Sequence, residues 1–206
     1  MPTDTVPVVD HPLGEDVLLR VKRATQEHHR RLESILPIAR DAFSLGDYLF
    51  VLEKFLGIYR PLEARIMEIS GMPESLQLDR RRKTALLEQD LSDLGVERQT
   101  FMALPHASVP ALHAVPEALG AMYVLEGATL GGQYISRSAG RNLGLDREKG
   151  CRFFSSYGPE VGSMWRSFGQ VVREQIGSTD AQTRFIAGAA NTFSCFEQWM
   201  GRDSNG

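Results

Sequence analysis

Cysteine is scarce in this chain of 206 residues, which has only Cys151 and Cys195, far apart and outside any Cys-x-x-Cys pair. This usage predicts neither a disulfide framework nor a thiolate metal site, and it favours a reducing compartment. An excess of positive charge is also lacking, because 23 Lys and Arg residues face 26 Asp and Glu residues, for a net charge of −3. We therefore expect no binding to nucleic acid or to an anionic membrane surface.

Long apolar runs and a targeting leader are missing as well. The longest uncharged run, Gln99–Pro116, contains three prolines, and no run reaches the roughly 20 apolar residues of a membrane helix. Residues 1–13 contain Pro and Asp but no cationic segment followed by an apolar one. They predict a flexible arm rather than a signal peptide. Together with the cysteine usage, these absences predict a cytoplasmic protein.

Helical periodicity extends along most of the chain, with apolar residues recurring at three- and four-residue steps. Asp16 is placed to cap the first helix, Pro61 to break or kink the second, and Gly95 to end another. No segment alternates in the manner of a strand, so we predict an all-α helical bundle. A single domain is expected at 14–201, between a flexible arm at 1–13 and a flexible tail at 202–206. The predicted helices cover residues 16–36, 43–59, 62–69, 80–94, 117–143, 159–176 and 180–200, with a proline-rich surface connection at 99–115.

A polar cluster on the first predicted helix carries a candidate for metal chemistry. His29 lies one helical turn after Thr25 and one turn before Glu33, so the three side chains share a face. Because a carboxylate often orients an imidazole that ligates a metal, Glu33 is suited to hold His29, directly or through water. Periodicity does not separate His29 from His28, but the residue four positions after His28 is Leu32, which cannot orient a ring. We therefore predict His29 as the ligand and expect little from His28; the alternative is an exposed polar face without a metal.

Glycines interrupt the longest predicted helix, 117–143, at five positions. Each glycine in a helix interior costs up to about 1 kcal/mol relative to alanine, so their number needs an explanation. Gly127, Gly131 and Gly132 remove side chains from one part of this helix. They could admit a flat ligand, permit a kink, or let another helix pack closely, and the spacing does not choose between these readings.

Aromatic residues recur within the helix predicted at 159–176. Side chains such as Trp165 and Phe168, at helical spacing, are typical of a protein core. Arg166 differs in kind, because a cation beside these rings is suited to pair with an anion at the edge of an apolar pocket. The alternative is an arginine solvated at the surface.

Together these segments resemble the heme oxygenase family, particularly its bacterial members that make biliverdin. The resemblance covers Val17 to Met200 and is carried by several motifs in a shared order. The motifs are Ala24-Thr25 followed by His29 and Glu33, the helix Tyr-Val-Leu-Glu-Gly-Ala-Thr-Leu-Gly-Gly-Gln, the Phe-Phe to Met-Trp-Arg segment, and Phe193 to Trp199. The resemblance implies a fold in which heme lies between the first, proximal helix and a kinked, glycine-rich distal helix.

The resemblance also implies roles for individual residues. His29 would be the proximal iron ligand and Glu33 its hydrogen-bonding partner. Gly127, Gly131 and Gly132 correspond to the distal-helix glycines that let the backbone cover the macrocycle. Further residues would contact heme, with cations at the propionates and aromatic side chains in the pocket wall; these are Lys22, Thr25, Tyr123, Arg166, Phe193 and Phe196.

The implied reaction is oxidative cleavage of heme, which is both cofactor and substrate, to biliverdin, carbon monoxide and ferrous iron. Dioxygen is the implied oxidant, and a reductase, a ferredoxin or a small reductant is the implied electron donor. A bacteriophytochrome is an implied recipient of the biliverdin. The chain departs from the animal enzymes at Ala128, where they have an aspartate that supports distal water. We expect water held by backbone carbonyls near Gly127, with help from Thr129, to replace that aspartate.

Three other protein classes share parts of these features. A ferritin-like di-iron protein needs Glu-x-x-His pairs, and no Glu in the sequence has a His three residues later. A helical scaffold or regulator needs only amphipathic helices and would bind no heme. A heme-binding sensor or carrier shares His29 and the pocket but lacks turnover, so it stays the alternative to an enzyme.

Overall fold

The computed structural model describes residues 15–201, and within them the chain forms helices and no β-strand. The prediction of an all-α fold is therefore confirmed, whereas the arm predicted at 1–13 and the tail at 202–206 lie outside the described residues. No helix in the described range is long and apolar enough to cross a membrane. The helices are α1 (Val17–Ile35), α2 (Leu45–Met67), α3 (Leu78–Arg81), α4 (Thr84–Asp93), α5 (Arg98–Met102), α6 (Val115–Leu143), α7 (Val161–Gln175) and α8 (Thr179–Met200), with 3-10 turns at Pro37–Ala39, Glu74–Leu76 and Gly158–Glu160.

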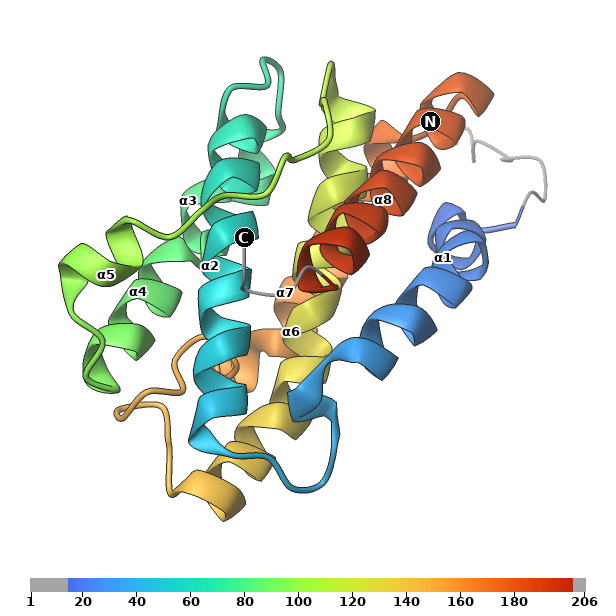
Figure 1. The fold of residues 1–206 in the computed structure, drawn as a ribbon. Coiled ribbons are helices and arrows are strands. Elements are labelled where there is room, and N and C mark those ends of the chain that lie inside the picture. Colours follow the sequence, from blue (N-terminus) through green and yellow to red (C-terminus); the bar gives the residue numbers. More distant parts are fainter. Residues whose placement is uncertain (1–14, 202–206) are drawn as a thin grey trace, which may run out of the picture.

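The crossing of α6 with α8 forms the centre of the bundle (Figure 1). A Cβ atom on Gly120 would lie 2.2 Å from the carbonyl oxygen of Phe185. On the other helix, a Cβ atom on Gly188 would lie 2.5 Å from the carbonyl oxygen of Glu117. The two backbones are thus in direct contact, which glycine alone permits. Because α1 packs on α8, this crossing also sets where α1 lies relative to α6.

α2 continues through Pro61 as one helix, so of the break or kink predicted between 43–59 and 62–69 the break does not occur. Proline at this position leaves the carbonyl of Gly57 without its usual donor four residues later. The N–H of Ala107 donates to that carbonyl at 2.9 Å. The helix stays intact because the proline-rich connection packs onto α2 and replaces the lost hydrogen bond.

The prediction of one helix at 80–94 is wrong, because the chain forms α3 and α4 with an extended Arg82 between them. The cause lies on α2. The buried carboxylate of Glu63 accepts the backbone N–H groups of Lys83 and Thr84, at 2.5 and 3.3 Å, and the Thr84 hydroxyl at 2.6 Å. Glu63 therefore caps α4 in place of a local residue, and the sequence near α4 carries no sign of it.

The segment that follows α6 is held by Asp90 of α4, whose side chain is fully buried. Its carboxylate oxygens accept the backbone N–H groups of Arg152 and Phe153 at 2.7 and 2.8 Å. This anchor sets the carbonyl of Phe154 against Gly132 of α6, where a Cβ atom would lie 2.9 Å from the oxygen. Burial raises the pKa of Asp90 to about 6, against the opposing effect of the two backbone hydrogen bonds.

The raised pKa of Asp90 predicts a pH-dependent stability. The pKa is about 6 in the folded chain and 3.8 for the ordinary group, so the folded state binds more protons between these values. The free energy of unfolding should therefore fall, by on the order of 3 kcal/mol at most, as the pH rises from about 4 to about 7. The Asp90→Asn variant lacks this titration, and urea unfolding of both proteins across that range measures the contribution. A difference between the two proteins that stays constant with pH would contradict the assignment.

Candidate functional site

α1 is fixed at its first turns by contacts with α7. Asp16 caps α1 by accepting the N–H of Leu18 at 2.8 Å, and its carboxylate also pairs with Arg173 of α7 at 2.8 Å. One turn earlier in α7, a Cβ atom on Gly169 would lie 3.0 Å from the Leu18 side chain. From the first contact to the second, the residue number rises on α1 and falls on α7. The two helices are therefore antiparallel.

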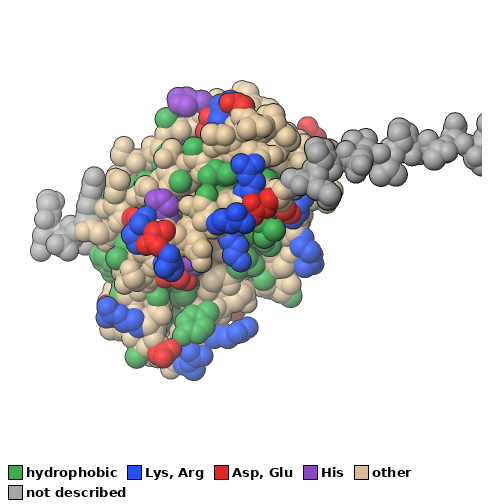
Figure 2. All heavy atoms as spheres, turned by 90° about the vertical axis from the view of Figure 1, so that its right-hand side faces the viewer, with side chains coloured by type: hydrophobic (Ala, Val, Ile, Leu, Met, Phe, Trp, Pro, Cys, Tyr) green, Lys and Arg blue, Asp and Glu red, His purple; other side chains and the backbone are tan. Residues whose placement is uncertain are grey.

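The antiparallel register places two cations at matching positions along the two helices, because Lys22 and Arg166 follow one turn beyond Leu18 and Gly169. Both side chains are exposed, and neither forms an ion pair within residues 15–201. Other basic residues of α1 do form ion pairs, namely Arg23 with Glu15, Arg30 with Glu27 and Arg31 with Glu197. Figure 2 shows one face of the molecule, on which Lys and Arg side chains lie next to Asp and Glu side chains. Lys22 and Arg166 are therefore available to an external anion.

His29 and Glu33 extend from the exposed side of α1. Each side chain is 60% exposed, and Nδ1 of His29 lies 3.2 Å from Oε2 of Glu33. Thr25, one turn before His29, is buried and donates its hydroxyl to the carbonyl of Val21 at 2.8 Å. Its side chain also interacts with Tyr123 of α6, where burial raises the pKa of the phenol and the threonine contact lowers it. The structure brings His29 and Glu33 together as the spacing predicts, whereas Thr25 faces the interior.

α6 contacts the N-terminal part of the chain at two places, once on α1 and once in the segment that follows α1. Thr25 interacts with Tyr123, and farther on the hydroxyl of Tyr134 donates to Asp41, beyond the end of α1, at 2.8 Å. Residue numbers rise together from the first contact to the second, so the helices run in the same direction, as Figure 1 also shows. His29 lies on α1 between these contacts.

The glycines of α6 have two different environments. A Cβ atom on Gly127 or Gly131 would meet no atom within 4 Å, so both face open space, and both lie on α6 between Tyr123 and Tyr134, which make the two contacts just described. Gly132 is buried, and close packing against the backbone of Phe154 accounts for it. Ala128, next to Gly127, is exposed. α6 remains one helix of 29 residues, and Figure 1 shows it changing direction along its length.

Phe193 of α8 lies against both histidines of α1. Its ring is stacked with that of His28, with centroids 6.2 Å apart, and meets His29 edge-on at 6.1 Å. Phe196 instead packs against Phe55 of α2 in the core, at 5.7 Å. Of the two phenylalanines proposed for the pocket wall, Phe193 is therefore the one that contacts His29.

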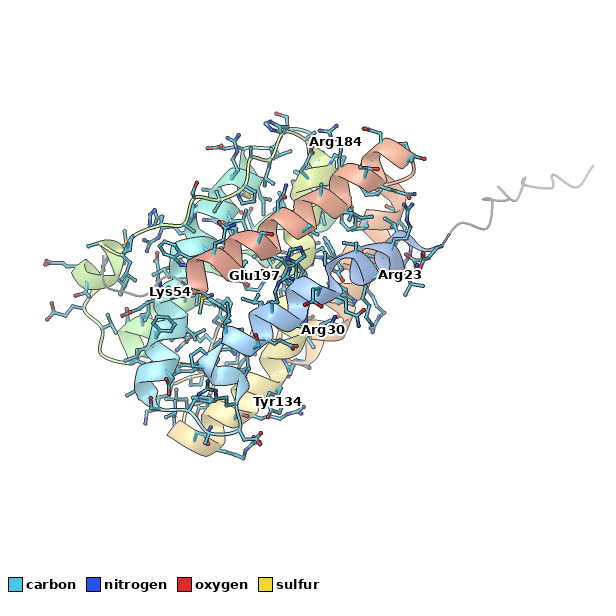
Figure 3. The ribbon with its side chains drawn as sticks, turned by 45° about the vertical axis from the view of Figure 1, so that its right-hand side comes forward. Arg23, Arg30, Lys54, Tyr134, Arg184 and Glu197 are labelled. Carbon is cyan, nitrogen blue, oxygen red and sulfur yellow. The ribbon has the colours of Figure 1, made fainter. Side chains whose placement is uncertain are left out.

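His28 has closer partners than its position in the sequence predicts. Its side chain is only 23% exposed, and Nδ1 lies 2.7 Å from Oε1 of Glu197. In Figure 3 Glu197 points from α8 toward α1. His28 therefore joins the two helices, a contact that the spacing of residues on α1 did not predict.

A buried ionic network holds α6 at Glu126, the residue before Gly127. Arg81 donates to one carboxylate oxygen, and the Tyr157 hydroxyl donates to the other at 2.8 Å. The ammonium group of Lys83 donates to Tyr157 at 2.7 Å, and burial lowers its pKa to about 8. Sequence reasoning missed this network because its members are far apart in the chain. The one local signal is a charged residue in an otherwise apolar stretch of the helix.

The sequence pattern and this geometry agree with the comparisons to known proteins. A sequence model of the heme oxygenase family matches residues 15–202. This match spans nearly the whole chain, and the chain belongs to the heme oxygenase family. The prediction of a heme oxygenase enzyme is thereby confirmed. A search among curated protein sequences gave no match.

Solved structures of three bacterial heme oxygenases are similar in fold. The enzyme of Neisseria meningitidis, determined with NO and CO bound, has a TM-score of 0.72 and 20% identity over 94% of this chain and 96% of that one. The enzyme of Leptospira interrogans has a TM-score of 0.75 and 16% identity, over 90% of this chain and 98% of that one. The enzyme of the cyanobacterium Synechocystis, determined in complex with heme, has a TM-score of 0.72 and 13% identity, over 90% and 91%.

The two environments of the α6 glycines predict opposite effects of one added methyl group. Gly131→Ala should stabilise the ligand-free protein by about 0.5–1 kcal/mol, because alanine favours the helix and the new Cβ meets nothing. Gly132→Ala should destabilise it by about 1–3 kcal/mol, because the new Cβ overlaps the Phe154 carbonyl. Urea unfolding of the ligand-free variants measures both. Equal destabilisation by the two substitutions would show that Gly131 is also a packing position.

Proposed function

We propose that this chain cleaves heme oxidatively to biliverdin, and that His29 is the residue that would ligate the heme iron. The observation that supports it most is the pairing of an exposed imidazole with bare backbone on the facing helix. His29 lies between Thr25 and Asp41, which contact Tyr123 and Tyr134 of α6, and Gly127 and Gly131 face open space between those two tyrosines. A flat macrocycle fits such a place, because no side chain of these glycines occupies it.

Glu33 orients the ligand. An ionised carboxylate only accepts hydrogen bonds, so with Glu33 at 3.2 Å the hydrogen of the His29 ring belongs on Nδ1. The lone pair of Nε2 is then left for the iron. A carboxylate in this position also raises the basicity of the ligand and fixes the ring, which is the usual role of such a partner.

Lys22 and Arg166 would bind the heme propionates. They are exposed, at matching positions in the α1–α7 register, and without an acidic partner among the described residues. Lys22 lies seven residues before His29, which is about 10 Å along the helix axis. The cations therefore stand to one side of the imidazole, where the carboxylates of an anionic ligand would meet solvent.

The bound heme supplies the iron that activates dioxygen and the ring that is opened, with release of carbon monoxide and ferrous iron. Ala128 offers no carboxylate at the distal side, and the hydroxyl of Thr129 donates to the Glu126 carbonyl at 2.6 Å. We infer that proton delivery depends on water held by backbone carbonyls near Gly127. Electrons would come from a reductase, a ferredoxin or a small reductant in the cytoplasm. A bacteriophytochrome is the proposed recipient of the biliverdin.

The ligand assignment is tested by His29→Ala. This variant should still bind heme, because the bare backbone at Gly127 and Gly131 and the proposed propionate contacts remain, but with an altered Soret band and no turnover. Added imidazole should restore part of the activity. Glu33→Ala should be milder, with roughly a 10- to 100-fold loss in affinity or activity. Absorption spectra, carbon monoxide release and chromatography of the bilin report these outcomes. A normal spectrum in His29→Ala would exclude His29 as the ligand, and heme binding without bilin formation in the wild type would favour a carrier or sensor.

The propionate assignment is tested by reversing one charge. Arg166→Glu should weaken heme binding about two- to five-fold, as expected for a partly exposed ion pair, and should alter the ratio of bilin isomers by letting the ring rotate. Arg23→Glu is the matched control, because Arg23 is an exposed cation of α1 that already pairs with Glu15. Heme titration and bilin chromatography of the two variants measure the affinity and the isomer ratio. Equal effects of both reversals would mean that only the overall charge matters.

A further inference from the structure

The two adjacent histidines of α1 have opposite environments. His29 is exposed, and its polar partner is the equally exposed Glu33 on the same helix. His28 is mostly buried, and its partners lie on α8, where Phe193 stacks on its ring and Glu197 meets its Nδ1 at 2.7 Å. The ring of Phe193 touches His29 as well, through its edge. One ring of α8 is therefore in contact with both histidines.

Glu197 binds two residues of α1 that lie almost one turn apart. Because its carboxylate only accepts hydrogen bonds, Nδ1 of His28 carries the hydrogen in this contact. The other carboxylate oxygen accepts Nε of Arg31 at 3.1 Å. Nη2 of Arg31 also lies 3.1 Å from Nδ1 of His28. Nδ1 already donates its hydrogen to Glu197, and Nη2 of Arg31 is itself only a donor, so this approach adds no hydrogen bond.

Two such contacts on one side of a helix resist its rotation about its own axis. Successive residues of an α-helix point about 100° apart, so a rotation that moves His28 moves the His29 ring by the same angle. The polar contact of His29 does not prevent this, because Glu33 rotates with it on the same helix. The contact of His29 with α8 is the edge of Phe193, which also stacks on His28. The direction of the His29 imidazole thus depends on how α1 is held against α8.

We propose that His28 is a positioning residue, which, held by Glu197 and Phe193, sets the rotation of α1 and so aims the His29 imidazole at the iron. This inference rests on the proposed function, in which His29 is the ligand. It assigns to His28 no contact with heme. Its effect is transmitted through the helix backbone to the next residue.

Two substitutions of His28 separate its hydrogen bond from its ring. His28→Phe keeps a ring to stack on Phe193 and removes the hydrogen bond to Glu197. His28→Asn removes the ring and keeps a donor nitrogen at the position of Nδ1. Asn and His have similar helix propensities, so the helix itself is not at issue. Arg20→Met is the matched control, because Arg20 joins α1 to Gln182 of α8 at a point distant from His29.

The readout is the low-temperature electron paramagnetic resonance spectrum of the ferric heme complex, which reports the axial ligand independently of turnover. We expect one histidine-ligated species in the wild type and in Arg20→Met. His28→Phe should shift the ratio of that species to a second, weakly ligated one by about tenfold, as expected for loss of a charge-assisted hydrogen bond. His28→Asn should restore most of the wild-type signal.

Amide hydrogen exchange of the heme-free proteins provides a second measurement. Protection in the last turns of α1 should fall in His28→Phe and in Glu197→Gln, and it should be recovered in His28→Asn. Wild-type resonance spectra in both His28→Phe and Glu197→Gln would overturn the proposal, and so would an equal shift in Arg20→Met. A wild-type spectrum in His29→Ala would instead contradict the proposed function, so the two failures are distinguishable.

Discussion

The direct contact between the backbones of α6 and α8 is the constraint on which the site depends. Gly120 and Gly188 let these helices approach until their main-chain atoms touch. α1 packs on α8, so the same contact determines how far the helix that carries His29 stands from the helix that carries Gly127. A side chain at this crossing would move α6 as a rigid unit, and the space between the histidine and the glycines would change with it.

Glycine serves two unrelated purposes on α6. At Gly120 and Gly132 a neighbouring backbone occupies the place of a side chain, so the gain from close packing offsets the loss of helix propensity. At Gly127 and Gly131 no neighbour fills the space, and the cost of about 1 kcal/mol for each is not recovered within the protein alone. Residues kept at a cost to stability are expected where a ligand replaces the missing contacts.

Buried carboxylates organise the irregular segments around α6. Glu63 caps α4 from a distance, Asp90 holds the segment of Phe153, and Glu126 joins α6 to Arg81. Burying a charge carries a desolvation cost, and the raised pKa of Asp90 and the lowered pKa of Lys83 show it. Such groups add little net stability, but a partner is costly to leave unpaired. They therefore determine where these segments lie more than how stable they are.

The sequence by itself determined the features that depend on residues within a turn or two of one another. These include the cap at Asp16, the helical periodicity, the approach of His29 to Glu33, and the ordered motifs that indicate the family. Only the tertiary structure decided that α2 passes through Pro61, that α3 and α4 are separate, that Gly131 and Gly132 differ, and that His28 joins two helices. The physical reason is that each of these depends on a partner from another part of the chain, at separations such as 20 residues for Glu63 and Lys83 or 169 for His28 and Glu197. Local propensity carries no information about which distant backbone group or carboxylate will contact a given residue in the folded chain.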